Sequence, residues 1–167
     1  MNDKKLLGFG LLLLSALSLM GCNPAAEEMD PLVQLQETGE CFDCNLAGAD
    51  LRELDLQEAR LNRSDLSGAN LSGMNLRRVL LDRANLTGAN LAGADLTEAA
   101  LTEANLAGAD LTEANLERVF LRNTDLTGAN LSRANLSRAN LTAADLTDAE
   151  LEGVQFEETV MPDGSRR

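Results

Sequence analysis

The sequence predicts an all-β solenoid, a rod in which short repeats stack on one another along the chain. Three observations predict it. Leucine recurs at every fifth residue from Leu46 through Leu151, at 22 consecutive positions, and Phe156 continues the series. Aromatic residues make up only 2% of the 167 residues, so smaller and more regular side chains must fill the core. The hydrophobic fraction of 44% is too high for a disordered chain.

Each five-residue unit follows one pattern. The residue two before the recurring position is Ala in 15 of 23 units, and the residue just before it is Asn or Asp in 17. A period of five fits neither an α-helix, with a period of 3.6 residues, nor a flat strand, with a period of 2. It fits a solenoid unit of one short side and one turn, with the leucine and the small residue inside. Hydrogen bonds between coils would then satisfy the backbone at the ~4.8 Å spacing of paired strands.

Runs such as Ala89–Gly93 (ANLAG) and Ala109–Glu113 (ADLTE) resemble the pentapeptide-repeat family, whose consensus is A-(D/N)-L-x-x. The resemblance covers about residues 44 to 158. It implies a right-handed, quadrilateral parallel β-helix with four pentapeptides per coil, and therefore about six coils. Residues twenty apart would then stack, and among the outward Asn and Asp positions only Asp125 and Asp145 would place one Asp on another. Because stacked carboxylates repel by ~1 kcal/mol even in water, this scarcity supports a coil of twenty residues.

The N-terminus indicates export. Two lysines in residues 1–5 precede the apolar run Leu6–Leu19, which suits a signal peptide and is too short for a spanning helix. The sequence Leu19-Met20-Gly21-Cys22 resembles the lipobox of bacterial lipoproteins, in which Cys22 becomes the lipidated first residue of the mature chain. Acyl chains on Cys22 would hold the protein stably at a membrane. The alternative is an ordinary secretory signal with an incidental cysteine.

These features divide the chain into four segments. We expect a signal peptide at residues 1–21, a lipid-anchored tether with a short capping helix at 22–40, the β-helix at 41–161, and a C-terminal tail at 162–167. The expected location is the bacterial cell envelope, with the protein anchored in a membrane and facing the periplasm or the exterior. The membrane is thus one expected partner, contacted through the lipid on Cys22.

The short helix is expected to cover the open first coil of the rod. Asp30 can cap its N-terminus, and Pro31 suits its first position. Leu32, Val33 and Leu35 are expected to supply its apolar contacts.

Composition excludes several classes of function. The formal net charge is −13, which disfavours direct binding to nucleic acid or to anionic lipid. The chain has no His, so it lacks the usual general base near neutral pH and the commonest metal ligand. The repeat places its carboxylates in solvated rows rather than in a cleft. One set of glycines recurs every twenty residues and is expected to form a column of turns, not a phosphate loop: Gly48, Gly68, Gly88, Gly108 and Gly128. We therefore expect no catalytic site, cofactor or metal.

Cys41 and Cys44 form a CxxC pair at the start of the repeat. In register, Cys41 occupies a central inward position and Cys44 the next small inward position. As the first and last residues of a four-residue turn, their Cα atoms should lie within ~7 Å of each other. In an exported protein this spacing favours a structural disulfide. Buried free thiols are the main alternative, and redox or metal chemistry is a weaker one, because two sulfurs without His make a poor zinc site.

A set of outward positions that lose the usual Asn or Asp falls on one face. Four exceptions to Asn or Asp are spaced by twenty residues: Arg60, Leu80, Ala100 and Phe120. Arg83 and Arg122 fall on or beside the same face, and arginine with aromatic residues is the composition of binding hot spots. We predict a face that binds a protein partner or a second copy. Alternatively, the tether, the short helix or the tail around Val160 and Met161 covers these side chains, or the apolar residues are simply tolerated on the surface.

A second column runs just before this face and alternates in charge: Glu58, Arg78, Glu98, Arg118 and Arg138. At ~4.8 Å between coils it predicts a ladder of ion pairs that favours one stacking register. Thr97, in the same row of units, is expected at the surface and should tolerate substitution.

Together these features predict a non-enzymatic lipoprotein of the cell envelope that acts as a structural or protein-binding scaffold. The alternative comes from the resemblance, since some family members mimic acidic duplex DNA and bind DNA gyrase. Export, the interspersed arginines and the lack of a C-terminal helix for the dimer contact of those members count against this alternative.

Overall fold

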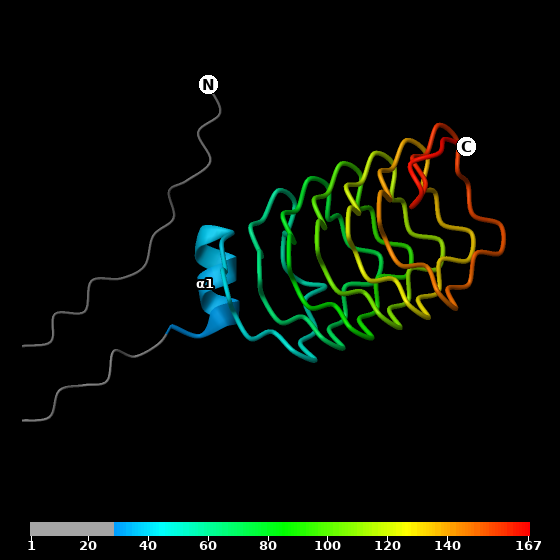
Figure 1. Cartoon of the computed structure of the whole chain (residues 1–167). Coiled ribbons are helices and arrows are strands. Elements are labelled where there is room, and N and C mark those ends of the chain that lie inside the picture. Colours follow the sequence, from blue (N-terminus) through cyan, green and yellow to red (C-terminus); the bar gives the residue numbers. More distant parts are fainter. Residues whose placement is uncertain (1–28) are drawn as a thin grey trace, which may run out of the picture.

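The computed structural model describes residues 29–167, so the predicted signal peptide, Cys22 and most of the tether lie outside the described residues. A single helix, α1 (Pro31–Thr38), lies at one end of a rod formed by the remaining described residues (Figure 1). Within residues 29–167, no helix has the length and apolar character that a membrane crossing requires. The sheet structure of the rod consists of single bridged residues rather than extended strands.

Parallel bridges join residues that are twenty apart along the chain. They run from Glu40↔Arg60 to Asn140↔Val160, with four bridges in each fully paired coil. The prediction of twenty residues per coil is therefore confirmed. Main-chain hydrogen bonds accompany the bridges. For example, the Leu91 N–H donates to the Asp110 carbonyl of the following coil at 2.7 Å. This ladder stacks successive coils at the spacing of paired strands.

Each unit closes with the same tight turn. In the unit around Leu91, the Leu91 carbonyl accepts from the Ala94 N–H at 3.0 Å, and Gly93 has a φ of 66°. The Asn90 Oδ1 accepts from the Ala92 N–H at 3.1 Å, which explains why Asn or Asp precedes the leucine. The predicted glycine column is confirmed as a column of turns, since its five members all have φ between 63° and 67°.

The core is a stack of leucines with small residues beside them. Every inner leucine from Leu46 to Leu141 is at most 3% exposed. Where Ser or Thr replaces Ala at the small inner position, the hydroxyl donates to a carbonyl of the preceding coil. These bonds are Ser64 to Cys41 at 2.6 Å, Thr124 to Leu101 at 2.8 Å, and Thr159 to Leu136 at 2.6 Å. The described residues leave no buried side-chain nitrogen or oxygen without a partner.

Helix α1 begins as its sequence predicts, and Gly39 ends it. The Asp30 Oδ1 accepts from the Leu32 N–H at 2.8 Å, and Gly39 ends the helix at a φ of 69°. Leu35 is 2% exposed and belongs to the core. The expectation that Leu32 and Val33 also make core contacts is wrong, because they are 39% and 44% exposed. Val33, two positions before Leu35, lies on another side of the helix. Leu32 lies near the side of Leu35, but it belongs to the first turn of the helix and stays exposed.

The chain ends in a small hairpin on the last coil. Val160 pairs with Arg166 in an antiparallel bridge. The Met161 N–H donates to the Ser165 carbonyl at 2.8 Å, and the Arg167 N–H donates to the Thr159 carbonyl at 3.0 Å. The tail therefore closes one corner of the last coil, at the end of the rod opposite α1 (Figure 1).

The core predicts a position-dependent cost of truncating leucine. Leu91 is 0% exposed and Leu151, at an equivalent inner position, is 37% exposed. Leu91→Ala leaves a cavity between packed coils and should lower the free energy of unfolding by about 2–5 kcal/mol. Leu151→Ala should cost clearly less, because solvent already reaches that side chain. Denaturant unfolding of both variants measures the difference, and equal losses would contradict the packing described here.

Candidate protein-binding face

The four exceptional outward residues stack in one column. Arg60 bridges Leu80, Leu80 bridges Ala100, and Ala100 bridges Phe120. We call these four residues the apolar face. Phe120 is 51% exposed, whereas Leu80 and Ala100 are partly buried between their neighbours. Leu80 and Phe120 lie two coils apart, at ~10 Å along the rod.

A second aromatic side chain adjoins the apolar face at the α1 end of the rod. Phe42 is 39% exposed, and the Arg60 guanidinium lies 5.4 Å from the centre of its ring. The Arg60 Nη1 also pairs with the Glu40 Oε1 at 3.2 Å. Sequence reasoning missed Phe42 because the residue precedes the unbroken leucine series. Its place directly after the inward Cys41 was the signal that it faces outward.

The two flanking arginines differ in their contacts. The Arg83 Nε donates to the Glu103 Oε2 at 2.8 Å, so its charge is matched by the next coil. Arg122 is exposed and has no carboxylate partner among residues 29–167. Arg122 is therefore the guanidinium that a partner at Phe120 could reach without breaking an existing ion pair.

A shallow groove of about 440 Å³ runs beside the apolar face and is lined by Phe42, Asn62, Arg63, Asp82, Arg83, Thr102 and Glu103. Asp82 organises its floor, because its Oδ1 accepts from the Thr102 N–H at 2.9 Å and its Oδ2 from the Asn62 Nδ2 at 3.3 Å. The groove is polar and carries both signs of charge, so it continues the surface of the apolar face with hydrogen-bonding groups.

The described residues leave Phe120 uncovered. The tail pairs with Val160 at the end of the rod, and the buried apolar side chain of α1, Leu35, lies in the core. The alternative in which the short helix or the tail covers Phe120 is therefore wrong, since half of the ring surface stays exposed. The tether residues that were also considered lie outside the described part of the chain.

The predicted ion-pair column is confirmed in the structure. Arg78 pairs with Glu58 at 3.4 Å and with Glu98 at 2.9 Å, and Glu98 also pairs with Arg118 at 3.2 Å. Since Arg78 and Glu98 each pair with the coils on both sides, the column links consecutive coils along one edge of the rod.

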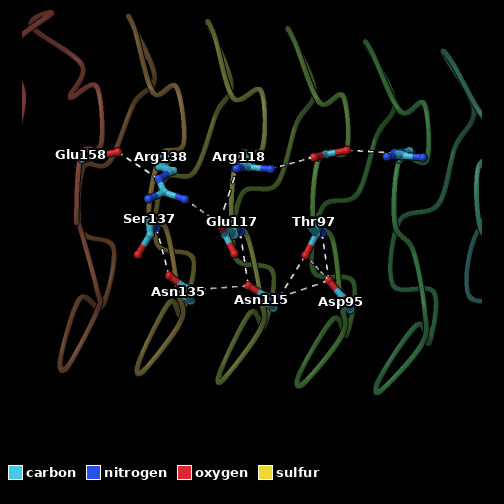
Figure 2. Close-up of polar contacts among 11 residues, drawn as sticks. Asp95, Thr97, Asn115, Glu117, Arg118, Asn135, Ser137, Arg138 and Glu158 are labelled. Atoms are coloured by element: carbon cyan, nitrogen blue, oxygen red, sulfur yellow. Dashed lines mark hydrogen bonds and ion pairs between the residues drawn. The ribbon is translucent and has the colours of Figure 1, made fainter.

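Two glutamates that the sequence prediction missed complete the column. Arg118 and Arg138 are stacked like charges, and Glu117 lies between them, 3.8 Å from Arg118 and 3.5 Å from Arg138 (Figure 2). Glu158 then pairs with Arg138 at 2.9 Å. Glu117 was missed because it belongs to the neighbouring outward position rather than to the column itself.

Thr97 lies in a polar row beside this column and is not a surface residue. It is 6% exposed, and its hydroxyl donates to the Asp95 Oδ1 while accepting from the Asn115 Nδ2 at 3.0 Å (Figure 2). The expectation that Thr97 lies at the surface is therefore wrong, and the tolerance to substitution expected from it loses its basis. These two hydrogen bonds hold the Thr97 side chain between the Asp95 carboxylate and the Asn115 amide, and it is therefore buried.

The ion pairs of the column stand at a strained backbone position. Arg78, Glu98 and Arg118 have φ values of 57°, 60° and 58°, in the left-handed region that costs a residue with a Cβ about 1 kcal/mol. Hydrogen bonds from Arg78, and then from Arg118, lower the pKa of Glu98 below its ordinary value. The column therefore favours the charged, folded state and offsets part of this backbone strain.

Cys41 and Cys44 are joined by a disulfide in the structure, with their Cα atoms 5.5 Å apart. Cys41 is fully buried, and Cys44 is partly buried beside it. Both occupy the inward positions that the register assigned to them. Within residues 29–167, no group of three or more His, Cys, Asp or Glu side chains is arranged to hold a metal ion. The oxidation state of the pair in the cell stays a prediction.

The ion-pair column predicts a pH-dependent effect of Glu98→Gln. Because the folded pKa of Glu98 lies below its ordinary value of 4.5, its stabilisation is present above that value and lost as the pH falls through the folded pKa. The variant should melt below the parent at pH 7, and the difference should vanish under strongly acidic conditions. Glu53→Gln, at an exposed position without an ion pair, is the control. A difference that persists at low pH would contradict the electrostatic origin.

Sequence comparisons identify the repeat. The profile described as "Pentapeptide repeats" matches eight copies, at residues 44–83, 80–118, 104–142 and 124–161. An uncharacterized protein of Synechocystis sp., slr0516, is 72% identical over 55 residues. That match covers 33% of this chain and 32% of the relative, so the chain spans about a third of the length of the curated relative it matches.

Two solved structures of similar proteins come from cyanobacteria. The pentapeptide repeat protein Rfr23 from Cyanothece 51142 is 31% identical, with a TM-score of 0.50 over 78% of this chain and 97% of that one. HetL, from Nostoc sp. strain PCC 7120 and involved in heterocyst differentiation regulation, is 39% identical over 77% of this chain and 66% of that one, with a TM-score of 0.31. With its period of five, its coil of twenty residues and a profile match over most of its length, the chain belongs to the pentapeptide-repeat family.

Proposed function

We propose that this protein is a non-enzymatic lipoprotein of the bacterial cell envelope that binds a protein partner through the apolar face of its rod. The observation that carries the proposal is the exposure of Phe120, at 51%, at a position where the repeat otherwise places Asn or Asp. Members of this family and its structural neighbours are in general scaffold or binding proteins rather than enzymes. Protein binding is therefore the class of function that family membership supports.

The apolar face has the composition of a binding hot spot. Phe120 would bury a large ring on contact, and aromatic anchors beside arginine dominate interface energies. Arg122 lies two residues after Phe120 and has no ion pair to break within residues 29–167. The groove lined by Asp82 and Arg83 adds a polar rim of both charges. We infer a partner surface with an apolar pocket for Phe120 and a carboxylate for Arg122.

The acidic DNA-mimic is the second candidate, and the net charge of −13 is the observation that favours it. Its weakness is the distribution of charge. Arg78, Arg118 and Arg138 neutralise carboxylates along one edge of the rod, so that edge is not a continuous row of negative charge. A proposed export signal would also separate the protein from cytoplasmic enzymes that act on DNA.

The lipid anchor and the finer architecture belong to the same proposal. Cys22 would carry the acyl chains, which leaves residues 23–30 to connect the membrane to α1. We further propose the right-handed coil of the family, with about six turns between residues 41 and 161 at twenty residues per turn. The rod would then extend ~27 Å from its anchored end.

The partner proposal is tested by restoring the family pattern on the apolar face. Leu80→Asn with Phe120→Asn should leave the melting temperature unchanged or higher, because the added amides can bond the turn as Asn90 does. The doubly substituted protein should lose its co-purifying protein or its dimer. Ala92→Asn with Ser132→Asn makes a matched change forty residues apart on another face and should keep the partner. A loss of stability with the partner retained would contradict the proposal, and recovery of gyrase from the parent would favour the DNA-mimic.

The anchor is tested separately. Cys22→Ala should release the protein from membrane fractions or leave an unprocessed precursor, and it should abolish labelling by a fatty-acid probe. Unchanged fractionation and labelling would show that Cys22 is not the lipidated residue.

A further inference from the structure

The two ends of the rod are covered differently. At the α1 end, the first inner residues Cys41 and Leu46 are 0% and 3% exposed, and Leu35 of α1 belongs to the same buried core. At the other end the inner series opens to solvent. Leu141 is 0% exposed, whereas Leu151 is 37% exposed. The last coil therefore presents apolar core side chains at its free end, opposite α1 (Figure 1).

The backbone of the last coil also has unused hydrogen-bond donors. In the preceding coil, the Leu131 N–H donates to the Glu150 carbonyl at 2.9 Å and the Arg133 N–H to the Glu152 carbonyl at 2.8 Å. The equivalent N–H groups of the last coil donate to no backbone carbonyl of residues 29–167: those of Leu146, Asp148, Leu151, Gly153, Phe156 and Glu158. Such an edge is a template for an added strand that brings carbonyl acceptors.

The C-terminal hairpin shows what this edge accepts. At the fourth corner, residues around Arg166 pair with Val160 as an antiparallel segment. The Arg167 guanidinium lies 5.5 Å from the centre of the Phe156 ring. An extended backbone with a cationic side chain over the apolar end is therefore already present at one corner, while the other three corners are open.

The last coil itself carries charge of one sign, and the two cations at this end, Arg166 and Arg167, belong to the C-terminal hairpin at one corner. Residues 141–162 contain no Lys or Arg and six carboxylates: Asp145, Asp148, Glu150, Glu152, Glu157 and Glu158. Among residues 29–167 only Glu158 of this set has an ion pair, with Arg138 at 2.9 Å. Earlier coils match their carboxylates with arginine, as Arg78 and Glu98 do. The last coil is thus an apolar centre surrounded by unpaired carboxylates.

We propose that this C-terminal end is a second docking surface, which binds an extended lysine- or arginine-rich segment of a partner protein. The carbonyls of the segment accept from the open N–H groups of the last coil. Its apolar side chains cover Leu151, and its cations pair with Glu150, Glu152 and Glu157. Charge complementarity selects the occupant, since an apolar end alone would accept any hydrophobic chain.

A second copy of the chain does not fit this end. A two-fold contact would place the same surface on both sides, so two sets of carboxylates would meet. Each edge would also face another edge with excess N–H donors rather than the carbonyls it needs. A basic partner segment removes both conflicts.

The test uses the purified full-length protein in a nonionic detergent and a labelled ten-residue peptide of alternating lysine and valine. The peptide should bind in a fluorescence anisotropy titration at low salt. Hydrogen exchange should show new protection at the amides of Leu151, Gly153, Phe156 and Glu158. A peptide of alternating glutamate and valine should not bind. Equal binding of both peptides, or protection elsewhere on the rod, would overturn the proposal.

Matched variants distinguish the effect of the carboxylates at the C-terminal end from the effect of the protein's overall negative charge. Glu150→Gln, Glu152→Gln and Glu157→Gln together should lower the affinity for the lysine peptide about tenfold. Each exposed ion pair contributes little, and the three small losses add up to this change. Glu37→Gln, Glu53→Gln and Asp55→Asn remove the same charge near α1 and should leave affinity within about twofold. Equal losses would show unspecific attraction and overturn the proposal. So would a concentration-dependent dimer that Leu151→Asp abolishes. The apolar face is unchanged in all of these variants, so failure here leaves the function proposed above standing.

Discussion

Hydrogen bonds between coils set the geometry on which the whole rod depends. In most units of the stacked coils, the N–H of the inner leucine donates to a carbonyl nineteen residues later, and the N–H of the residue before that leucine donates to a carbonyl twenty-one residues back. These two bonds hold adjacent coils at ~4.8 Å, which is also a good packing distance for stacked leucine side chains. Every surface column follows from this stacking, because residues twenty apart are brought together whether or not their side chains attract each other. The outward side chains then add or remove stability without choosing the fold.

The sequence alone predicted the placement of residues that follow the five-residue period. Given the twenty-residue coil that the resemblance to the family implied, the register of Cys41 and Cys44 and the alternation of Arg78 with Glu98 follow from counting along the chain. The single column of Leu80 and Phe120 follows in the same way. Such positions could be predicted because a solenoid converts separation in sequence directly into separation in space.

What could not be predicted depends on where a side chain turns after leaving the backbone. Thr97 occupies an outward position, yet two hydrogen bonds lay it against the coil and bury it. Glu117 leaves its own row to lie between Arg118 and Arg138. Leu32 is an apolar residue of the kind that packs into a core, but in this short helix only Leu35 is buried and Leu32 stays exposed. Side-chain rotamers and the segments at the ends of the rod do not follow the five-residue period, so the period of the sequence predicts neither.

The coil of twenty residues has a consequence for how such a protein can change in evolution. Inserting one pentapeptide keeps a leucine at every inner position, so the core would accept it. Every later unit would, however, move by a quarter of a coil. An insertion between Ala100 and Phe120 would stack Phe120 on Asn105 instead of on Ala100, and the apolar face would be divided between two sides. The interior can thus lengthen in steps of five residues, while a functional surface survives only changes of twenty. Lineages that keep one partner should therefore differ in length by whole coils.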